Sequence, residues 1–245
     1  MNGYMNSYMS NQMNNSVKGL FCFPRVLLAV ACFFLGQFIV AGYVVAEEIE
    51  TEVRQVVEDS TQQLVDKLNK EKANYSENPE RFYSEMDAAL SELVDFKRIA
   101  ARVMGKYARK ATKEQRSRFL VSFKRSLYVA YSRALVESGA FEISVNDAKL
   151  NPRSDKKASV NLVVTSASGN QYPVVYSMHF AKNNEWMLEN VIVNGVNVGL
   201  AFRDRFNQEV REQKGDLDSV IDGWSSTVDI KGAGEGVDKS DVATK

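Results

Sequence analysis

Residues 141–193 read FEISVNDAKLNPRSDKKASVNLVVTSASGNQYPVVYSMHFAKNNEWMLENVIV. This stretch is rich in β-branched and aromatic residues, and clusters of Asn, Gly, Ser and Pro interrupt it at short intervals, which is typical of strands joined by turns. Connections this short favour an antiparallel meander over strands linked by crossover helices. We therefore predict about four antiparallel strands, at Phe141–Leu150, Ala158–Ser166, Tyr172–Ala181 and Trp186–Val193.

Alternation along two of these strands predicts which side chains face the interior. Successive strand residues point to opposite faces of a sheet, so every second residue shares a face. Large apolar residues hold such alternate positions in both strands, namely Val160, Leu162 and Val164 in one and Val174, Tyr176 and Met178 in the next. His179 has the opposite parity, so we expect it to be at the surface or half-buried, in a structural role.

The chain on either side of the strands has the apolar spacing of amphipathic helices. Capping signals and this spacing predict helices at about 48–71, after Asn78-Pro79, from Asp95 to about Ala108, from Thr112 to Gly139, over about 198–213, and from Asp216 to Trp224. Helices followed by a meander and a closing helix indicate an α+β fold. The helical N-terminal half is expected to cover one face of a curved antiparallel sheet, with an apolar cavity between sheet and helices.

Basic residues concentrate in the two helices predicted between Asp95 and Gly139. Residues 96–133 contain twelve Lys or Arg and a single acidic residue, Glu114, although the complete chain is neutral. Apolar and aromatic residues recur at helical spacing through the same segment, which gives these helices one apolar and one cationic face. Residues 47–94 are acidic, with 13 acidic and 5 basic residues. The two segments either pair with one another or dock oppositely charged partners.

The N-terminal segment is typical of an export signal. Lys18 and Arg25 precede an apolar run over 26–46, and small residues lead to the acidic start at Glu47. We therefore predict a signal peptide at 1–46 and a periplasmic location. The apolar run is also about long enough to span a bilayer, so a retained membrane anchor stays an alternative.

The remaining chain is expected to hold one domain and a tail. Both cysteines lie in the predicted signal, so an exported chain of residues 47–245 forms no disulfide and depends on an ordinary core. Its size suits a single α+β domain over 47–224. Residues 225–245 are rich in Gly, Ser, Asp and Lys, which predicts a disordered tail.

Catalytic and metal-binding patterns are mostly missing from the sequence. The chain has one histidine, His179, and no cysteine after residue 46, which rules out the usual metal clusters. It contains neither a phosphate-binding glycine-rich loop nor a G-x-S-x-G elbow, so we predict no catalytic residue, metal or cofactor. A cavity enzyme with a Tyr and Asp pair stays open, although the inward strand positions carry no carboxylate. Nucleic-acid binding is disfavoured because the aromatic residues have core spacing.

Three segments in order carry a family signature. Residues 95–107, DFKRIAARVMGKY, are similar to D-F-x-R-I-x-x-x-V-L-G-K-Y, and residues 111–123, ATKEQRSRFLVSF, to A-T-x-x-Q-x-x-x-F-x-x-x-F. Residues 186–206 are similar to W-x-x-x-D-V-x-x-E-G-V-S-L followed by Y-R-x-x-F. Together they resemble the MlaC family of periplasmic phospholipid-binding shuttles, also called toluene-tolerance auxiliary proteins, over roughly Val53 to Trp224.

The third segment departs from the family pattern at three positions. Asn190 stands where the family usually has Asp, Asn194 where it has Glu, and Asn197 where it has Ser. These changes put the details of this loop in doubt and leave the other two segments intact.

The resemblance implies a soluble lipid carrier without enzymatic activity. MlaC-like proteins hold glycerophospholipid by its acyl chains and pass it between an outer-membrane lipoprotein complex and an inner-membrane ABC transporter complex, which maintains outer-membrane lipid asymmetry. The implied cavity walls are Val103, Tyr107, Phe123, Leu127, Tyr131, Val160, Leu162, Val164, Val174, Tyr176 and Met178, and the implied head-group or partner rim is Arg98, Arg102 and Lys106. A cavity enzyme and a membrane-anchored adaptor that binds only proteins remain as alternatives.

Overall fold

The computed structural model describes residues 23–137 and 141–224, with side chains from Ala46 onward except that of residue 134. The first 22 residues of the predicted signal and the whole of the predicted tail at 225–245 lie outside this part. From Glu48 onward the chain forms one unit, which is described here by itself. Among the residues that the structure describes, no helix is both long enough and apolar enough to cross a membrane.

The strands form one antiparallel sheet in the order β1-β2-β3-β4-β5, as the short turns predicted. Four of them match the predicted strands, and β5 adds a fifth, two-residue strand; their bounds are β1 Glu142–Asn151, β2 Ser154–Thr165, β3 Gln171–Phe180, β4 Trp186–Val193 and β5 Val196–Asn197. The turn between β4 and β5 consists of Asn194 and Gly195, which both have positive φ, 50° and 78°. Asn and Gly tolerate this backbone conformation best, so the pair turns the chain within two residues.

The helices begin at the predicted caps. Asn78 accepts a hydrogen bond from the backbone N–H of Arg81, Asp95 accepts one from that of Arg98, and Thr112 and Gln115 form a reciprocal capping box. The α-helices of the structure are α1 Phe23–Glu71, α2 Pro79–Leu93, α3 Phe96–Met104, α4 Lys113–Glu137, α5 Val198–Glu212 and α6 Leu217–Gly223.

Two short 3-10 helices, η1 Lys72–Asn74 and η2 Gly105–Arg109, continue the ends of α1 and α3. The helix predicted up to about Ala108 therefore ends earlier, at Met104. The physical reason is Gly105, whose φ of +56° cannot continue a right-handed helix.

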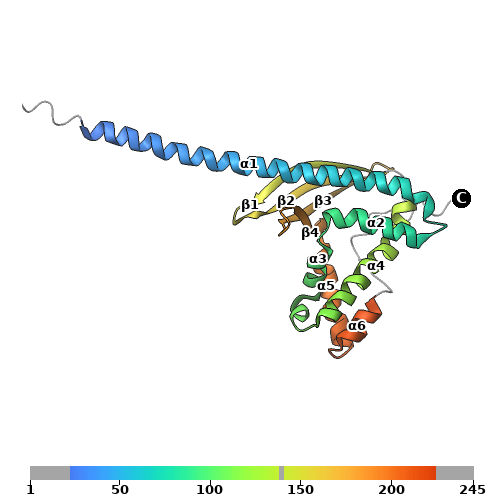
Figure 1. Cartoon of the computed structure of the whole chain (residues 1–245). Helices are drawn as coiled ribbons and strands as arrows, with labels where there is room; N and C mark the ends of the chain where they lie inside the picture. Colours follow the sequence, from blue (N-terminus) through green and yellow to red (C-terminus); the bar gives the residue numbers. More distant parts are fainter. Residues whose placement is uncertain (1–22, 138–140, 225–245) are drawn as a thin grey trace, which may run out of the picture. The chain divides into compact units, whose positions relative to one another are not determined.

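Side chains from the sheet and from α1, α2 and α3 form the first core cluster. Figure 1 shows the part of α1 from Glu48 onward running alongside the sheet, while α3, α4, α5 and α6 gather beyond β4. The inward strand positions were predicted correctly, because Val160, Leu162, Val174 and Met178 are buried in this cluster and Val164 and Tyr176 pack against it. Val53 and Val57 of α1 meet them with no exposed surface. Burial of this apolar face is what holds the helices on the sheet.

A second core cluster lies among the helices and is aromatic. Its rings include Phe119, Phe123, Phe202, Phe206 and Trp224, all at most 3 % exposed. Phe119 and Phe206 pack edge to face with ring centroids 4.9 Å apart, and Phe119 and Trp224 do so at 5.3 Å. Such pairs add stability beyond the area that they bury.

A third cluster joins α1, α2 and α4 around Phe82 and Tyr128. The Tyr128 hydroxyl donates a 2.6 Å hydrogen bond to Asp87 on α2, and Lys124 forms an ion pair with the same carboxylate. Burial, together with this bond, raises the pKa of the Tyr128 hydroxyl, which therefore stays protonated.

We predict that Tyr128→Phe lowers the free energy of unfolding by about 2 kcal/mol, because the substitution removes a hydrogen bond to a charged group and keeps the buried ring. Urea unfolding at pH 7 measures this change. In an Asp87→Asn background the same substitution should cost clearly less, since the charged acceptor is gone. An equal cost in both backgrounds would contradict the prediction.

Candidate functional site

A β-bulge in β4 places a buried carboxylate next to α3. Ser177 pairs with Asn190 and Met178 pairs with Leu188, so Glu189 is an extra residue between the two pairs. A bulge re-aims a side chain that regular alternation would direct elsewhere. The Glu189 carboxylate, 5 % exposed, meets Arg98 Nε at 2.5 Å, Arg102 Nη1 at 3.0 Å and Lys157 Nζ at 3.3 Å.

The charge of Glu189 is stable in this environment. Burial alone would raise the pKa of its carboxyl group. The hydrogen bond from Arg98 and the charges of Arg102, Arg98 and Lys157 outweigh burial, so the pKa is below its ordinary value. Glu189 is therefore an anion that holds the two arginines of α3 against β4.

We predict that Glu189→Gln makes the free energy of unfolding less dependent on pH in the acidic range. Because the folded pKa is depressed, the carboxylate contributes stability above its unfolded pKa of about 4.3, and this contribution is lost as the pH falls through the folded value. The free energy of unfolding of the native protein should thus fall more steeply below pH 5 than that of the variant. Glu92→Gln, on the exposed face of α2, is the control and should keep the native slope. The prediction would be contradicted if the free energies of unfolding of the native protein and of Glu189→Gln fell with the same slope below pH 5.

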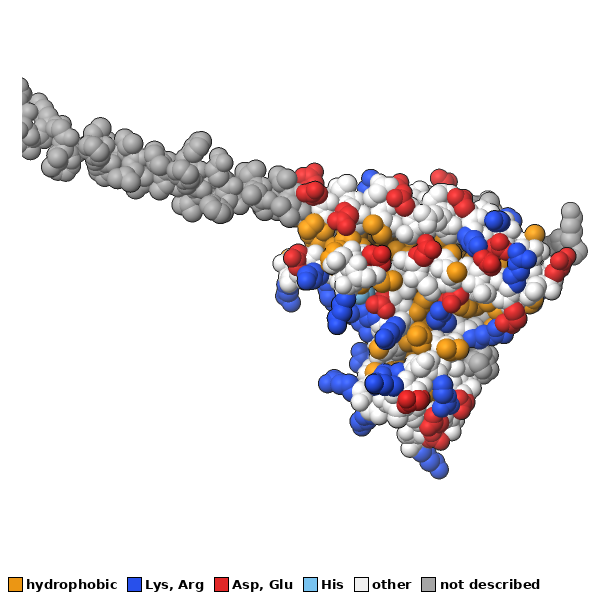
Figure 2. Space-filling view, in the orientation of Figure 1, with side chains coloured by type: hydrophobic (Ala, Val, Ile, Leu, Met, Phe, Trp, Pro, Cys, Tyr) orange, Lys and Arg blue, Asp and Glu red, His pale blue; other side chains and the backbone are white. Residues whose placement is uncertain are grey.

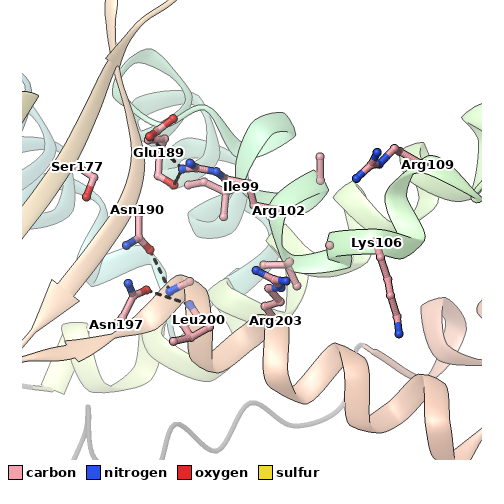
Figure 3. Close-up of a pocket in the computed structure, with 14 residues that line it drawn as sticks. Ile99, Arg102, Lys106, Arg109, Ser177, Glu189, Asn190, Asn197, Leu200 and Arg203 are labelled. Atoms are coloured by element: carbon pink, nitrogen blue, oxygen red, sulfur yellow. Dashed lines mark hydrogen bonds and ion pairs between the residues drawn. The ribbon is translucent and has the colours of Figure 1, made fainter. Parts of the chain in front are cut away.

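Next to Glu189 lies a pocket of about 640 Å³, which we call the basic pocket. It lies between α3, η2, the start of α5 and the facing residues of β3 and β4, and Figure 3 shows its lining. Four basic side chains line it, namely Arg102, Lys106, Arg109 and Arg203, together with the polar side chains of Ser177, Glu189, Asn190 and Asn197 and the apolar side chains of Ile99, Val103 and Leu200.

Two asparagines build the wall of the basic pocket at the start of α5. The side-chain oxygen of Asn190 accepts a 3.1 Å hydrogen bond from the backbone N–H of Gly199, and that of Asn197 accepts a 2.9 Å bond from Leu200. The strand and the helix approach so closely that a Cβ at Gly199 would lie 2.3 Å from the Asn190 oxygen. Two of the three departures from the family pattern thus lie in this wall, and both side chains hold the helix terminus.

Within the described part of the chain, the remaining basic side chains of the pocket have no acidic partner. Among residues 46–137 and 141–224, no carboxylate oxygen lies within 4 Å of the charged nitrogens of Lys106, Arg109 or Arg203. Lys106 lies over the ring of Tyr107 instead, 5.1 Å from its centroid. Arg203 points from α5 toward the α3–η2 segment, and Arg109 points back from η2 (Figure 3). In Figure 2, which has the orientation of Figure 1, Lys and Arg side chains also gather on the side of the molecule where α3 and η2 lie.

The predicted site residues fall into two places. Arg102, Lys106 and Val103 line the basic pocket, and Arg98 binds Glu189 beside it. The others lie outside the lining of this pocket: Phe123 is buried in the second cluster, Tyr107 and Leu127 pack against it, and Tyr131 is half-buried on α4. The six predicted strand residues all belong to or pack against the first cluster.

Several pocket residues were missed by the sequence analysis. Glu189 has no inward parity, and only the bulge in β4 brings it to the pocket. Arg203, in the last part of the family signature, comes from α5, about one hundred residues after Arg102 in the chain. The distances between these residues along the sequence do not indicate that their side chains lie close together in the fold. The departures at Asn190 and Asn197 were the one indication available that this loop is distinctive.

His179 is more buried than predicted. Its side chain is 7 % exposed, and its Nε2 lies 3.1 Å from Oδ2 of Asp95, the residue that caps α3. The expected surface or half-buried position was wrong. The α2–α3 link covers it, since Val94 forms a bridge with Leu188 and Asp95 donates its backbone N–H to Leu188.

Comparison with known proteins agrees with the sequence resemblance. The family described as MlaC protein matches residues 58–226. A toluene tolerance protein of Pseudomonas putida, ttg2D, is 41 % identical over 174 residues, which are 71 % of this chain and 80 % of the relative. A phospholipid-binding protein from Ralstonia solanacearum, solved in complex with a phospholipid, has the same fold, with a TM-score of 0.62 at 17 % identity over 71 % of this chain and 99 % of that one.

Proposed function

Because this chain belongs to the MlaC family, we propose that it is a periplasmic phospholipid carrier that contributes to toluene tolerance. The observation that carries the proposal is the similarity itself, which spans most of the folded unit and includes a relative named for toluene tolerance. The fold shared with a protein solved with bound phospholipid supports it.

The acyl chains are assigned to the space between the sheet and the helices. Val160, Leu162, Val174 and Met178 on the sheet face the apolar side chains of α1, α2 and α3, and Leu127 of α4 packs against this cluster as well as the aromatic one. In the structure the four strand side chains are at most 6 % exposed and pack within one apolar cluster. Uptake of lipid therefore requires the helices to move away from the sheet, with acyl methylenes replacing side-chain contacts.

Burial of the acyl chains supplies the binding free energy. Each buried CH₂ group contributes about 0.8 kcal/mol, so two chains bind tightly without any recognition of the head group. The same burial makes spontaneous release into water slow. A carrier of this kind needs partner complexes that accept the lipid directly, and we assign this role to an outer-membrane lipoprotein complex and an inner-membrane ABC transporter complex.

The N-terminal segment fits export to the periplasm. We propose that residues 1–46 direct export and are removed, and that residues 47–224 are the lipid-binding domain. N-terminal sequencing of the exported protein tests the first point. A start at Glu47 is expected, whereas a retained apolar segment would favour an anchored adaptor.

The pocket chemistry favours a carrier over an enzyme. Its buried carboxylate, Glu189, is bound by Arg98, Arg102 and Lys157, which lower its pKa. A carboxylate stabilised in this way is a weak base and a poor proton acceptor at neutral pH. We therefore assign it a structural role.

Native mass spectrometry of the protein, purified from the periplasm without detergent, tests the proposed function. We expect the protein to carry bound phospholipid, and the delipidated protein to take up phospholipid from vesicles. A Val121→Ala variant, changed at an exposed position of α4, controls for preparation effects and should behave identically. Protein that is empty and takes up no lipid would overturn the proposal.

A further inference from the structure

A buried threonine on the inner side of α1 has a hydroxyl group without a hydrogen-bond partner. Thr61 is 5 % exposed, and its Oγ1 bonds to no other group in the described part of the chain. A threonine inside a helix often donates to the backbone carbonyl one turn earlier, here that of Val57, and the Thr61 hydroxyl does not. Because a buried polar group loses its hydration, native proteins nearly always give it a partner. The Thr61 hydroxyl therefore points to an acceptor from outside the chain.

Thr61 lies on the face of α1 that borders the space assigned to the acyl chains. Val53, Val57, Thr61 and Leu68 follow one another at helical spacing and are all buried, so they share one face of the helix. Val57 belongs to the first cluster and Leu68 to the third, and Leu90 of α2 packs against both clusters. Thr61 is thus one helical turn from Val57, where the two clusters adjoin. When the helices move away from the sheet to admit lipid, its hydroxyl opens onto the space that the acyl chains enter.

Two buried indole groups differ from Thr61 in their surroundings. The Nε1 atoms of Trp186 and Trp224 also lack a hydrogen-bond partner among the described residues. Each indole, however, packs edge to face against another aromatic ring, Trp186 against Phe180 and Trp224 against Phe119. The face of an aromatic ring accepts an N–H weakly. Neither indole therefore requires an atom of a ligand.

An ester carbonyl is the acceptor that suits the position of Thr61. The buried positions around it on α1, Val53, Val57 and Leu68, are apolar and carry no positive charge. A phosphate group buried there would lose its hydration without a cation in return, which is far more costly than the burial of a neutral acceptor. In a glycerophospholipid the ester carbonyl oxygens are neutral acceptors, and they are attached directly to the acyl chains. They enter the apolar space together with the chains.

We propose that the Thr61 hydroxyl donates a hydrogen bond to an ester carbonyl of the carried phospholipid, and that the protein thereby prefers ester-linked acyl chains to ether-linked alkyl chains. This assignment rests on the proposed function and adds to it a preference for the linkage between glycerol and chains. It places the glycerol end of the lipid beside Thr61, where the first and third clusters adjoin, and the chains beside the first cluster.

Thr61→Val is the sharpest variant for a test, because valine has nearly the shape of threonine and lacks only the hydroxyl. Since this hydroxyl has no partner in the lipid-free protein, the delipidated variant should unfold at the same temperature as the native protein or at a higher one. Thr61→Ser keeps the hydroxyl and loses the methyl group, so it should bind lipid with the native preference. Thr51→Val is the matched control, since Thr51 is an exposed threonine of the same helix.

The measurement is the affinity of each delipidated protein for dihexanoylphosphatidylcholine and for its dihexyl ether analogue, which lacks only the two carbonyl oxygens. Comparing the ratio of these two affinities between proteins cancels the general difference in hydrophobicity between the lipids. We expect the ratio of ester to ether affinity to fall about fivefold in Thr61→Val, the scale of one hydrogen bond. Thr61→Ser and Thr51→Val should keep the native ratio.

Three outcomes would overturn the assignment. If Thr61→Val has the native ratio of ester to ether affinity, Thr61 does not bind the ester, although the proposed lipid carriage stands. If Thr61→Val unfolds at a lower temperature than the native protein or does not fold, the hydroxyl has its partner within the lipid-free protein. If the native protein binds neither lipid, the assignment and the proposed function fail together.

Discussion

Lengthening both acyl chains of a water-soluble phosphatidylcholine from six to eight carbons is expected to tighten its binding about 200-fold, because four additional CH₂ groups at about 0.8 kcal/mol each contribute roughly 3 kcal/mol. The prediction follows from assigning the acyl chains to the apolar space between the sheet and the helices. Isothermal titration of the delipidated protein with lipid below its critical micelle concentration measures the change.

Two controls separate the effect of acyl-chain length on affinity from effects of the head group. Exchange of choline for another zwitterionic head group at constant chain length should change the affinity far less than the added methylenes do. The longer chain should also make the heat-capacity change of binding more negative, the sign of apolar burial. An affinity that does not depend on chain length would contradict an acyl-binding site and with it the proposed carriage of lipid.

Phe206→Ala is expected to lower the free energy of unfolding by about 3–5 kcal/mol, the usual cost of removing a large buried ring. Phe206 has no exposed surface and packs against the rings of Phe119, Trp224 and Tyr107. Its loss opens a cavity in the aromatic cluster where α4, α5 and α6 meet, and rigid neighbouring rings collapse into such a cavity poorly. Urea unfolding followed by far-UV circular dichroism measures the change.

Val121→Ala is the matched control, because Val121 is 66 % exposed on the neighbouring helix α4. It should change the free energy of unfolding by no more than about 0.5 kcal/mol. A loss below about 1 kcal/mol for Phe206→Ala would show that α5 contributes little to the core, against the buried packing seen here.

Most of the fold could be predicted from local patterns. The alternation of Val160, Leu162 and Val164 identified the inner face because a strand has a strict period of two residues, and this face lies in the sheet cluster. The caps at Asn78 and Asp95 could be predicted because a cap involves atoms only three residues apart. Local errors had local causes, such as Gly105, whose positive φ ends α3 earlier than expected.

The basic pocket could be predicted only in part. Arg98, Arg102 and Lys106 stood out because they lie together in a basic segment that matches the family signature. Glu189, which binds Arg98 and Arg102, lies 91 residues from Arg98, and no pattern of charge or hydropathy indicates that the two meet. The exposure of His179 was misjudged for the same reason, since the chain that covers it lies 84 residues away.

The sequence by itself determined the α+β class, the order of helices and strands, the inner face of the sheet, the helix starts and the family. These properties depend on neighbours within a few residues, or on signatures that are read directly from the chain. Only the tertiary structure decided where the charges lie. The bulge at Glu189, the approach of α5 to β4 at Gly199, and the convergence of Arg109 and Arg203 on one pocket depend on contacts between distant segments. Packing of whole elements sets such contacts, and local pattern does not encode them.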